Sequence, residues 1–97
     1  MGTATFELGR VLATPAALEA LAASGEAVET YLARHAARDW GECDEAGRTF
    51  NDRAVEDGSR VSSVYRTAAG VTLDATTEAC DPKGRRACTT ILRDSDY

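Results

Sequence analysis

Seven carboxylates gather between positions 39 and 57 of this 97-residue chain. Only Arg48 and Arg53 oppose them there, and acids and bases balance over the rest of the chain, so the whole net charge of −5 falls within this stretch. Phosphates would be repelled by such a surface, whereas a basic groove on a protein would be attracted to it. The predicted partner-binding residues are Asp39, Glu42, Asp44, Glu45, Asp52, Glu56 and Asp57.

The spacing of these acids predicts a charged face on a helix over residues 44–57. At 100° per residue, Glu45, Asp52 and Glu56 fall within about 20° of one line, with Phe50 and Ala54 on the far side. A line of carboxylates can mimic the regular charge of a nucleic-acid backbone. The alternative is an ordinary solvated helix face, which Arg48 favours because it can pair with Glu45 and Asp52.

A nucleophilic site is the weaker possibility. His35, Cys43 and Asp44 have the residue types of a nucleophile, base and orienting acid. Eight positions and a helix end separate His35 from Cys43, and neighbouring acids would raise the pKa of the Cys43 thiol. We therefore predict a non-catalytic protein and a core position for His35.

The cysteines and glycines predict neither a metal site nor a bound cofactor. Cys43, Cys80 and Cys88 include no Cys-x-x-Cys pair, and with one histidine they make a poor zinc site. Cys80 and Cys88 flank a predicted hairpin and could form a disulfide there if their Cα spacing allowed it, or remain small thiols. The eight glycines are isolated, so no phosphate-binding loop is present.

Length and composition predict one cytoplasmic domain over residues 1–97. An odd cysteine number fits a reduced compartment. The chain shows no secretion signal and no apolar run near the ~18 residues of a membrane span, so we expect no membrane partner.

Helix signals fill the first 60 residues. Thr14 and Pro15 favour a helix start, with Leu18, Leu21 and Ala22 on one face and Gly25 at its end. A second helix is predicted over 26–38, with Trp40 folding back onto the core. The third helix, over 44–57, ends at Gly58.

Strand signals follow. Residues 60–66, 70–77 and 88–93 are rich in Val, Thr, Ile and Leu, which favours a three-stranded antiparallel meander. Residues 81–84 predict a type I turn, with Arg85 and Arg86 extending the loop tip. A further strand is predicted over 6–14, broken at Gly9, and could join the meander. The predicted fold is α+β, with helices packed on one face of a 3–4-stranded antiparallel sheet.

The order of motifs resembles a family of small proteins carried on plasmids, prophages and other mobile elements. The resemblance covers nearly the whole chain and rests on residues 6–18, 32–35, 39–41, 51–52, 58–61, 63 and 65, 77–78, 89–92 and 96–97. Its most specific parts are the Ala-Thr-Pro helix start, Arg34-His35 followed by Asp39-Trp40-Gly41, and the ending formed by residues 89–92 and 96–97. Two departures are a more polar 71–76 segment and a longer, more basic 80–87 turn.

This resemblance implies an inhibitor of host defence, because small acidic proteins of mobile elements often have that role. In particular, the chain resembles a type I anti-CRISPR protein of the kind that acts on a type I-C system. The implied partner is a guide-RNA surveillance complex, whose DNA-binding groove the inhibitor would block. The alternative is a plasmid- or restriction-associated regulatory protein that binds another host protein through its sheet and the Arg85–Arg86 loop. A thiol enzyme using Cys43 is the third hypothesis.

Overall fold

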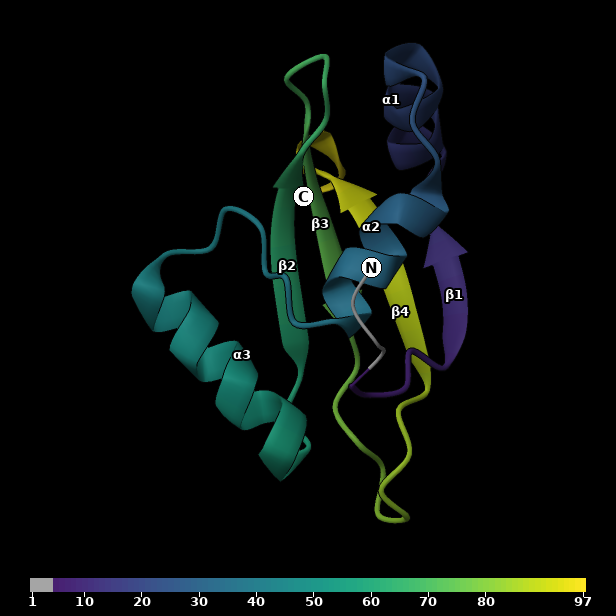
Figure 1. Cartoon of the computed structure of the whole chain (residues 1–97). Coiled ribbons are helices and arrows are strands. Elements are labelled where there is room, and N and C mark those ends of the chain that lie inside the picture. Colours follow the sequence, from purple (N-terminus) through teal and green to yellow (C-terminus); the bar gives the residue numbers. More distant parts are fainter. Residues whose placement is uncertain (1–4) are drawn as a thin grey trace.

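The computed structural model describes residues 5–97 and contains three α-helices and a four-stranded sheet (Figure 1). A 3-10 turn, Asp94–Asp96, follows the last strand. The elements in chain order are β1 (Arg10–Ala13), α1 (Pro15–Ser24), α2 (Val28–Ala36), α3 (Glu45–Asp57), β2 (Val61–Arg66), β3 (Thr72–Thr77) and β4 (Cys88–Arg93). The α+β class is confirmed.

The sheet is mixed and not wholly antiparallel. Its strand order is β1-β4-β3-β2. The predicted meander of β2, β3 and β4 is present, but β1 lies parallel to β4, with Arg10 beside Cys88 and Ala13 beside Ile91. The antiparallel prediction was wrong for this pair. Three helices and two strands lie between β1 and β4 in the sequence, and this long connection lets the two strands run in the same direction.

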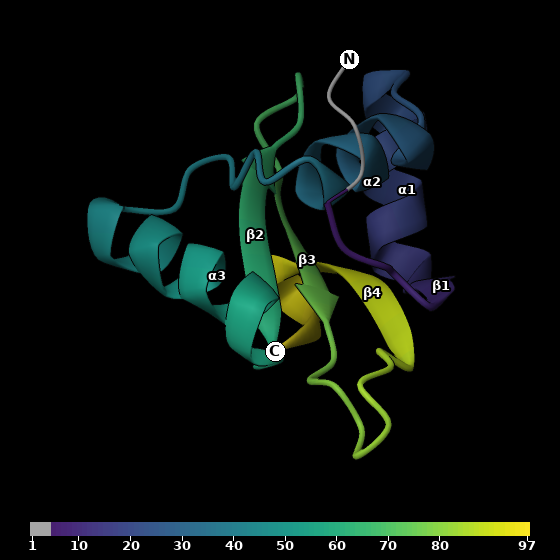
Figure 2. The same cartoon turned by 60° about the horizontal axis from the view of Figure 1, so that its bottom comes forward.

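The main core lies between the sheet and the first two helices. Alternate strand residues Tyr65, Leu73 and Ile91 are each buried to 1% exposure, and Leu21 and Tyr31 pack against them from α1 and α2. The other face of the sheet is half-exposed along all three meander strands. Figure 2 shows α1 and α2 together on one side of the strands, whereas α3 runs beside β2.

Helix ends follow their local signals. Thr14 accepts a hydrogen bond from the Ala17 amide, and Gly25 closes α1 in the left-handed region at φ 69°. Asp44 caps α3 in the same way through the Gly47 amide, and Gly58 closes that helix. Among residues 5–97, no helix combines the length and apolar character that a membrane crossing requires.

The buried face of α1 differs from the prediction. Ala17, Ala20 and Leu21 face the core, whereas Leu18 is 49% exposed and Ala22 is also exposed. Alanines at the contact let the helix backbone approach the sheet, so the larger Leu18 points outward.

The first strand is shorter than predicted, and Gly9 explains its start. Gly9 has φ 65°, and a Cβ there would clash with the backbone of Arg86 and Ala87. The chain therefore turns at Gly9, and Phe6 packs with the second core cluster around Trp40. Trp40 is 3% exposed, as its predicted return to the core requires.

Candidate functional site

All seven predicted carboxylate residues are exposed, but they divide between two structural settings. Asp39 and Glu42 lie in the loop between α2 and α3, and Asp44 is the N-cap of α3. The other four are on α3 itself and comprise Glu45, Asp52, Glu56 and Asp57. The acidic stretch therefore forms a loop and one helix, not a single row.

Three of the seven carboxylates form ion pairs with arginines of the same chain. Their closest N–O distances are 2.7 Å for Arg34–Asp39, 2.8 Å for Arg38–Glu56 and 3.3 Å for Arg66–Glu42. All three arginines lie outside the 39–57 stretch, so counting charge within that stretch missed them. Arg34 also lowers the pKa of the Asp39 carboxyl, chiefly through its hydrogen bond. The negative surface is consequently weaker than its sequence predicts.

Three further carboxylates accept hydrogen bonds from neutral donors and form no ion pair within the described part of the chain. Asp44 binds the Gly47 amide at 2.7 Å, and Asp57 binds the Ser59 amide at 2.8 Å. The third, Asp52, accepts the indole N–H of Trp40 at 3.1 Å.

Glu45 has neither a hydrogen bond nor an ion pair with any residue of the described part of the chain. The expected pairing of Arg48 with Glu45 and Asp52 is absent, because Arg48 instead donates to the Cys43 carbonyl at 2.7 Å. Glu45 is thus the carboxylate of α3 that is most available to a partner.

Asn51 attaches α3 to the outer edge of β2. Its Nδ2 donates to the Ser62 carbonyl at 2.7 Å, and its Oδ1 accepts from the Ser62 amide at 3.2 Å. One turn later, Ala54 is 1% exposed in the second core cluster. These contacts bury one side of α3 and fix which side faces solvent.

The solvent side of α3 carries an exposed aromatic residue as well as acids. Phe50 is 60% exposed, so it does not contribute to the core as its apolar character would favour. Two shallow depressions run along this side. The α3 outer face, as we use the name, comprises Glu45, Ala46, Thr49, Phe50, Asp52, Arg53, Glu56 and Asp57.

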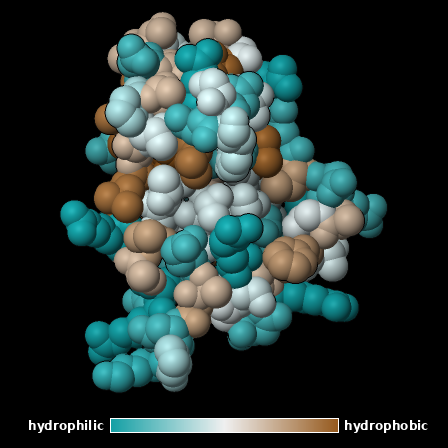
Figure 3. All heavy atoms as spheres, turned by 180° about the vertical axis from the view of Figure 1, so that it is seen from behind, coloured by the Kyte–Doolittle hydropathy of each residue, from teal (hydrophilic) through white to brown (hydrophobic). Residues whose placement is uncertain are grey.

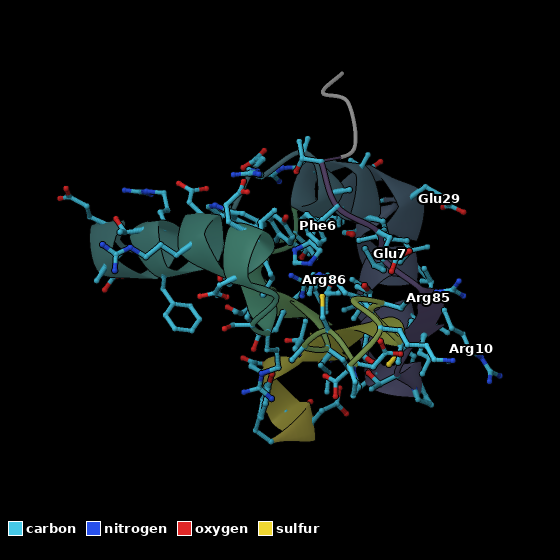
Figure 4. The ribbon with its side chains drawn as sticks, turned by 90° about the horizontal axis from the view of Figure 1, so that it is seen from below. Phe6, Glu7, Arg10, Glu29, Arg85 and Arg86 are labelled. Atoms are coloured by element: carbon cyan, nitrogen blue, oxygen red, sulfur yellow. The ribbon has the colours of Figure 1, made fainter. Side chains whose placement is uncertain are left out.

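Arg86 holds the far end of α3 and is not part of an exposed loop tip. It is 5% exposed, and its guanidinium donates to the carbonyls of Ala54, Ser59 and Glu78 at 2.8–3.1 Å. The same group stacks over Phe6, 5.6 Å from the ring centre (Figure 4). Its charge lies at the negative C-terminal end of the helix dipole, where the acidic last turn of α3 lacks any basic residue of its own.

His35 is fully buried in a directed chain of hydrogen bonds. Thr89 Oγ1 donates to the Leu8 carbonyl at 2.8 Å, so it must accept from Thr77, 2.6 Å away. Thr77 must in turn accept from His35 Nε2 at 2.8 Å, which leaves Nδ1 to accept from Ser63. Burial, aided by the Arg86 charge, lowers the pKa of the ring to about 4, so the ring is neutral with its proton on Nε2.

This hydrogen-bond network leaves Cys43 without a general base, since both ring nitrogens of His35 are hydrogen-bonded to other residues. The Cys43 thiol is half-buried with its pKa raised, chiefly by burial, and donates to the Ser62 carbonyl. The Ser63–His35 pair resembles a nucleophile and base, but both residues are 0% exposed and no substrate could reach them. One inward-facing hydroxyl residue on each of three strands, Ser63, Thr77 and Thr89, was the sequence signal for this network.

The hairpin cysteines are not opposite one another. Cys80 pairs with Arg86 across the hairpin, while the Glu78 amide donates to the Cys88 carbonyl. All three cysteines are free thiols. Within residues 5–97, no group of three or more His, Cys, Asp or Glu side chains is placed to hold a metal ion.

Comparison of the chain with protein-family models, with curated proteins and with solved structures finds no match. The α3 outer face combines exposed carboxylates with an exposed aromatic residue, which the packing of the core does not require.

Proposed function

We propose that this chain is a non-catalytic binding protein that occupies a basic, nucleic-acid-binding groove on another protein through its α3 outer face. The observation that carries the proposal is Phe50, which is 60% exposed beside Glu45 and Arg53 in a shallow depression of a helix that Asn51 anchors to β2. Exposed aromatic side chains at the centre of a polar surface are typical anchors of protein interfaces.

The charges of α3 fit a basic partner. Glu45 is unpaired within the described chain, and Asp52 and Asp57 bind only neutral donors. The Arg38–Glu56 pair involves a Glu56 side chain that is 74% exposed. Exposed pairs of this kind contribute about 0–1 kcal/mol, so a cationic groove can exchange with Arg38 at little cost.

The partner class comes from the sequence resemblance. A type I CRISPR surveillance complex has the required chemistry, since its groove tracks DNA phosphates with basic side chains. The chain would then act as an anti-CRISPR inhibitor by competing with target DNA. Such electrostatic association is expected to be fast and sensitive to salt.

A competition experiment tests this proposal. A purified type I-C surveillance complex is mixed with labelled target DNA, and inhibition of DNA binding is measured for the wild type and for the double variant Glu45→Lys/Phe50→Ala. Both residues are exposed and make no polar contact in the described chain, so the variant should fold normally. We expect at least a hundredfold weaker inhibition, equivalent to about 2.7 kcal/mol.

The matched control is Glu29→Lys, which makes a charge reversal on α2, away from α3. It should inhibit as the wild type does. Equal inhibition by the wild type and the double variant, with both folded, would contradict the use of α3. Absence of inhibition by the wild type would contradict the surveillance complex as the partner.

The rival regulatory hypothesis depends on the β3–β4 hairpin. Of the three basic residues there, only Lys83 and Arg85 are exposed, because Arg86 is buried. The double variant Lys83→Ala/Arg85→Ala therefore separates the hypotheses without disturbing the core. Binding through α3 should tolerate it.

A further inference from the structure

The two edges of the sheet differ in whether their outward backbone groups are hydrogen-bonded. At the β2 edge, the Val64 amide donates to the Trp40 carbonyl, the Glu42 amide donates to the Val64 carbonyl, and Asn51 binds both polar groups of Ser62. At the β1 edge, no backbone partner is found among residues 5–97 for the outward groups of the strand. An open strand edge is a template for pairing with another chain.

The outward groups of β1 belong to Val11 and Ala13. The amides of Arg10 and Thr14 donate to Ala87 and Ile91 beside β4, and a parallel strand directs alternate residues to the same neighbour. The amides and carbonyls of Val11 and Ala13 therefore point away from the sheet. Charged or proline residues, which usually block such an edge, are missing from positions 11–13.

Apolar surface accompanies this edge. Val11, Leu12 and Leu18 are 43%, 41% and 49% exposed. Helix α1 is apolar on all sides apart from Glu19 and the terminal Ser24, a composition typical of a helix that is covered all round. Figure 3 shows brown, hydrophobic spheres along the side where β1 and α1 lie.

We propose that β1 pairs antiparallel with β1 of a second copy, making a two-fold dimer with one continuous eight-stranded sheet. In the register centred on Leu12, Val11 of each copy lies opposite Ala13 of the other. The outward amides and carbonyls of Val11 and Ala13 are then all hydrogen-bonded in both copies. The two Leu12 side chains meet directly across the axis as a non-hydrogen-bonded pair.

Opposite charges at the β1 edge favour a second copy of this chain as the strand that pairs with β1. In this register Arg10 of each copy lies opposite Thr14 of the other. The Thr14 hydroxyl donates to the exposed Asp96 carboxylate at 2.6 Å. The 3-10 turn that carries Asp96 packs against β3 on the half-exposed face of the sheet, where the Tyr97 hydroxyl donates to Asp74. Arg10 shares that face, because it pairs with Cys88 of β4. A cation therefore meets an anion on both sides of the axis.

The dimer does not depend on the proposed function, since α3 lies at the opposite edge of the sheet. It would leave both α3 outer faces free and point them away from each other. Two such faces on one particle would make binding bivalent for a partner with repeated subunits.

Engineered cysteines test the register. Leu12→Cys and Val11→Cys are made separately in the full chain, oxidised mildly and compared on non-reducing gels, with the wild type controlling for the native thiols. Across the axis, Leu12 residues have Cα atoms about 4.5 Å apart, within disulfide range, whereas Val11 residues are about 9 Å apart. We expect at least tenfold more covalent dimer from Leu12→Cys.

Sedimentation of the unmodified chain gives a second, independent measurement. The wild type should dimerise with rising concentration, Leu12→Lys should stay monomeric at the same concentrations, and Phe50→Lys on α3 should behave as the wild type. A wild type that is monomeric throughout, or a Val11→Cys yield equal to or above that of Leu12→Cys, would overturn the proposal. Pairing of β1 with an added apolar peptide strand, without self-association, would also overturn it.

Discussion

The guanidinium of Arg86 donates a hydrogen bond to the Ala54 carbonyl at 2.9 Å, joining the β3–β4 hairpin to the last turn of α3. Two more carbonyls, of Ser59 and Glu78, accept from the same group. A charged side chain from the hairpin thus fixes the helix that carries the candidate site.

Replacing this arginine should destabilise the whole domain. Arg86→Ala removes three charge-assisted hydrogen bonds and leaves the Ser59 and Glu78 carbonyls without this donor, whereas the Ala54 carbonyl keeps the Gly58 amide. We expect a loss of about 3 kcal/mol or more in the free energy of unfolding. Urea denaturation measures it. Arg85→Ala, the exposed neighbour, is the matched control and should change stability by less than about 0.5 kcal/mol. Equal stability of both variants would show that Arg86 does not anchor α3.

Removing the amide of Asn51 should free α3 from the β2 edge. Asn51→Ala loses two hydrogen bonds to Ser62, which leaves the Ser62 amide unpaired and its carbonyl with only the Cys43 thiol, so we expect a cost of about 2 kcal/mol. Hydrogen exchange at the Ser62 amide should accelerate well before global unfolding. Thr49→Ala, exposed on the same helix, should leave that exchange rate unchanged. An unchanged rate in Asn51→Ala would disprove the anchoring role.

The histidine predicts a loss of stability in acid. The folded pKa of His35 is about 4, below its unfolded value of about 6.5, so the unfolded state binds more protons between these values. The contribution of the neutral His35 ring to the free energy of unfolding is complete above pH 6.5. It falls by about 3 kcal/mol as the pH drops toward 4. His35→Gln should flatten this part of the pH profile. An NMR titration of the His35 ring giving a pKa near 6.5 would contradict the predicted burial effect.

Binding to a basic groove should weaken with salt. Raising the ionic strength from 0.05 to 0.5 M shortens the screening length, so the affinity of the wild type for its partner should fall steeply. Glu45→Lys removes one favourable charge and should reduce the slope of the logarithm of affinity against that of salt. Fluorescence anisotropy measures both slopes. An affinity independent of salt would leave α3 as an apolar contact only and contradict charge mimicry.

Local signals predicted much of this fold. The caps at Thr14 and Asp44 and the glycines that end α1 and α3 act within a few residues, so the helix bounds follow from neighbouring sequence. The 61–66, 72–77 and 88–93 strands lie where richness in Val, Thr, Ile and Leu predicted them, and along each of them buried residues alternate with half-exposed ones.

Long-range partners escaped prediction. The parallel pairing of β1 joins residues almost 80 positions apart, and no local pattern specifies it. Arg86 resembled a loop residue because its acceptors are backbone carbonyls that carry no sequence signature. The same holds for the arginines that pair with Asp39, Glu42 and Glu56, which the count within 39–57 omitted.

The most direct test of the account is the footprint of the chain in complex with a type I-C surveillance complex, measured by hydrogen–deuterium exchange. The account predicts that binding slows exchange in α3 and the loop before it, residues 39–57, while residues 81–87 of the hairpin are unaffected. Protection confined to the hairpin or to the half-exposed face of the sheet, with α3 unchanged, would contradict it.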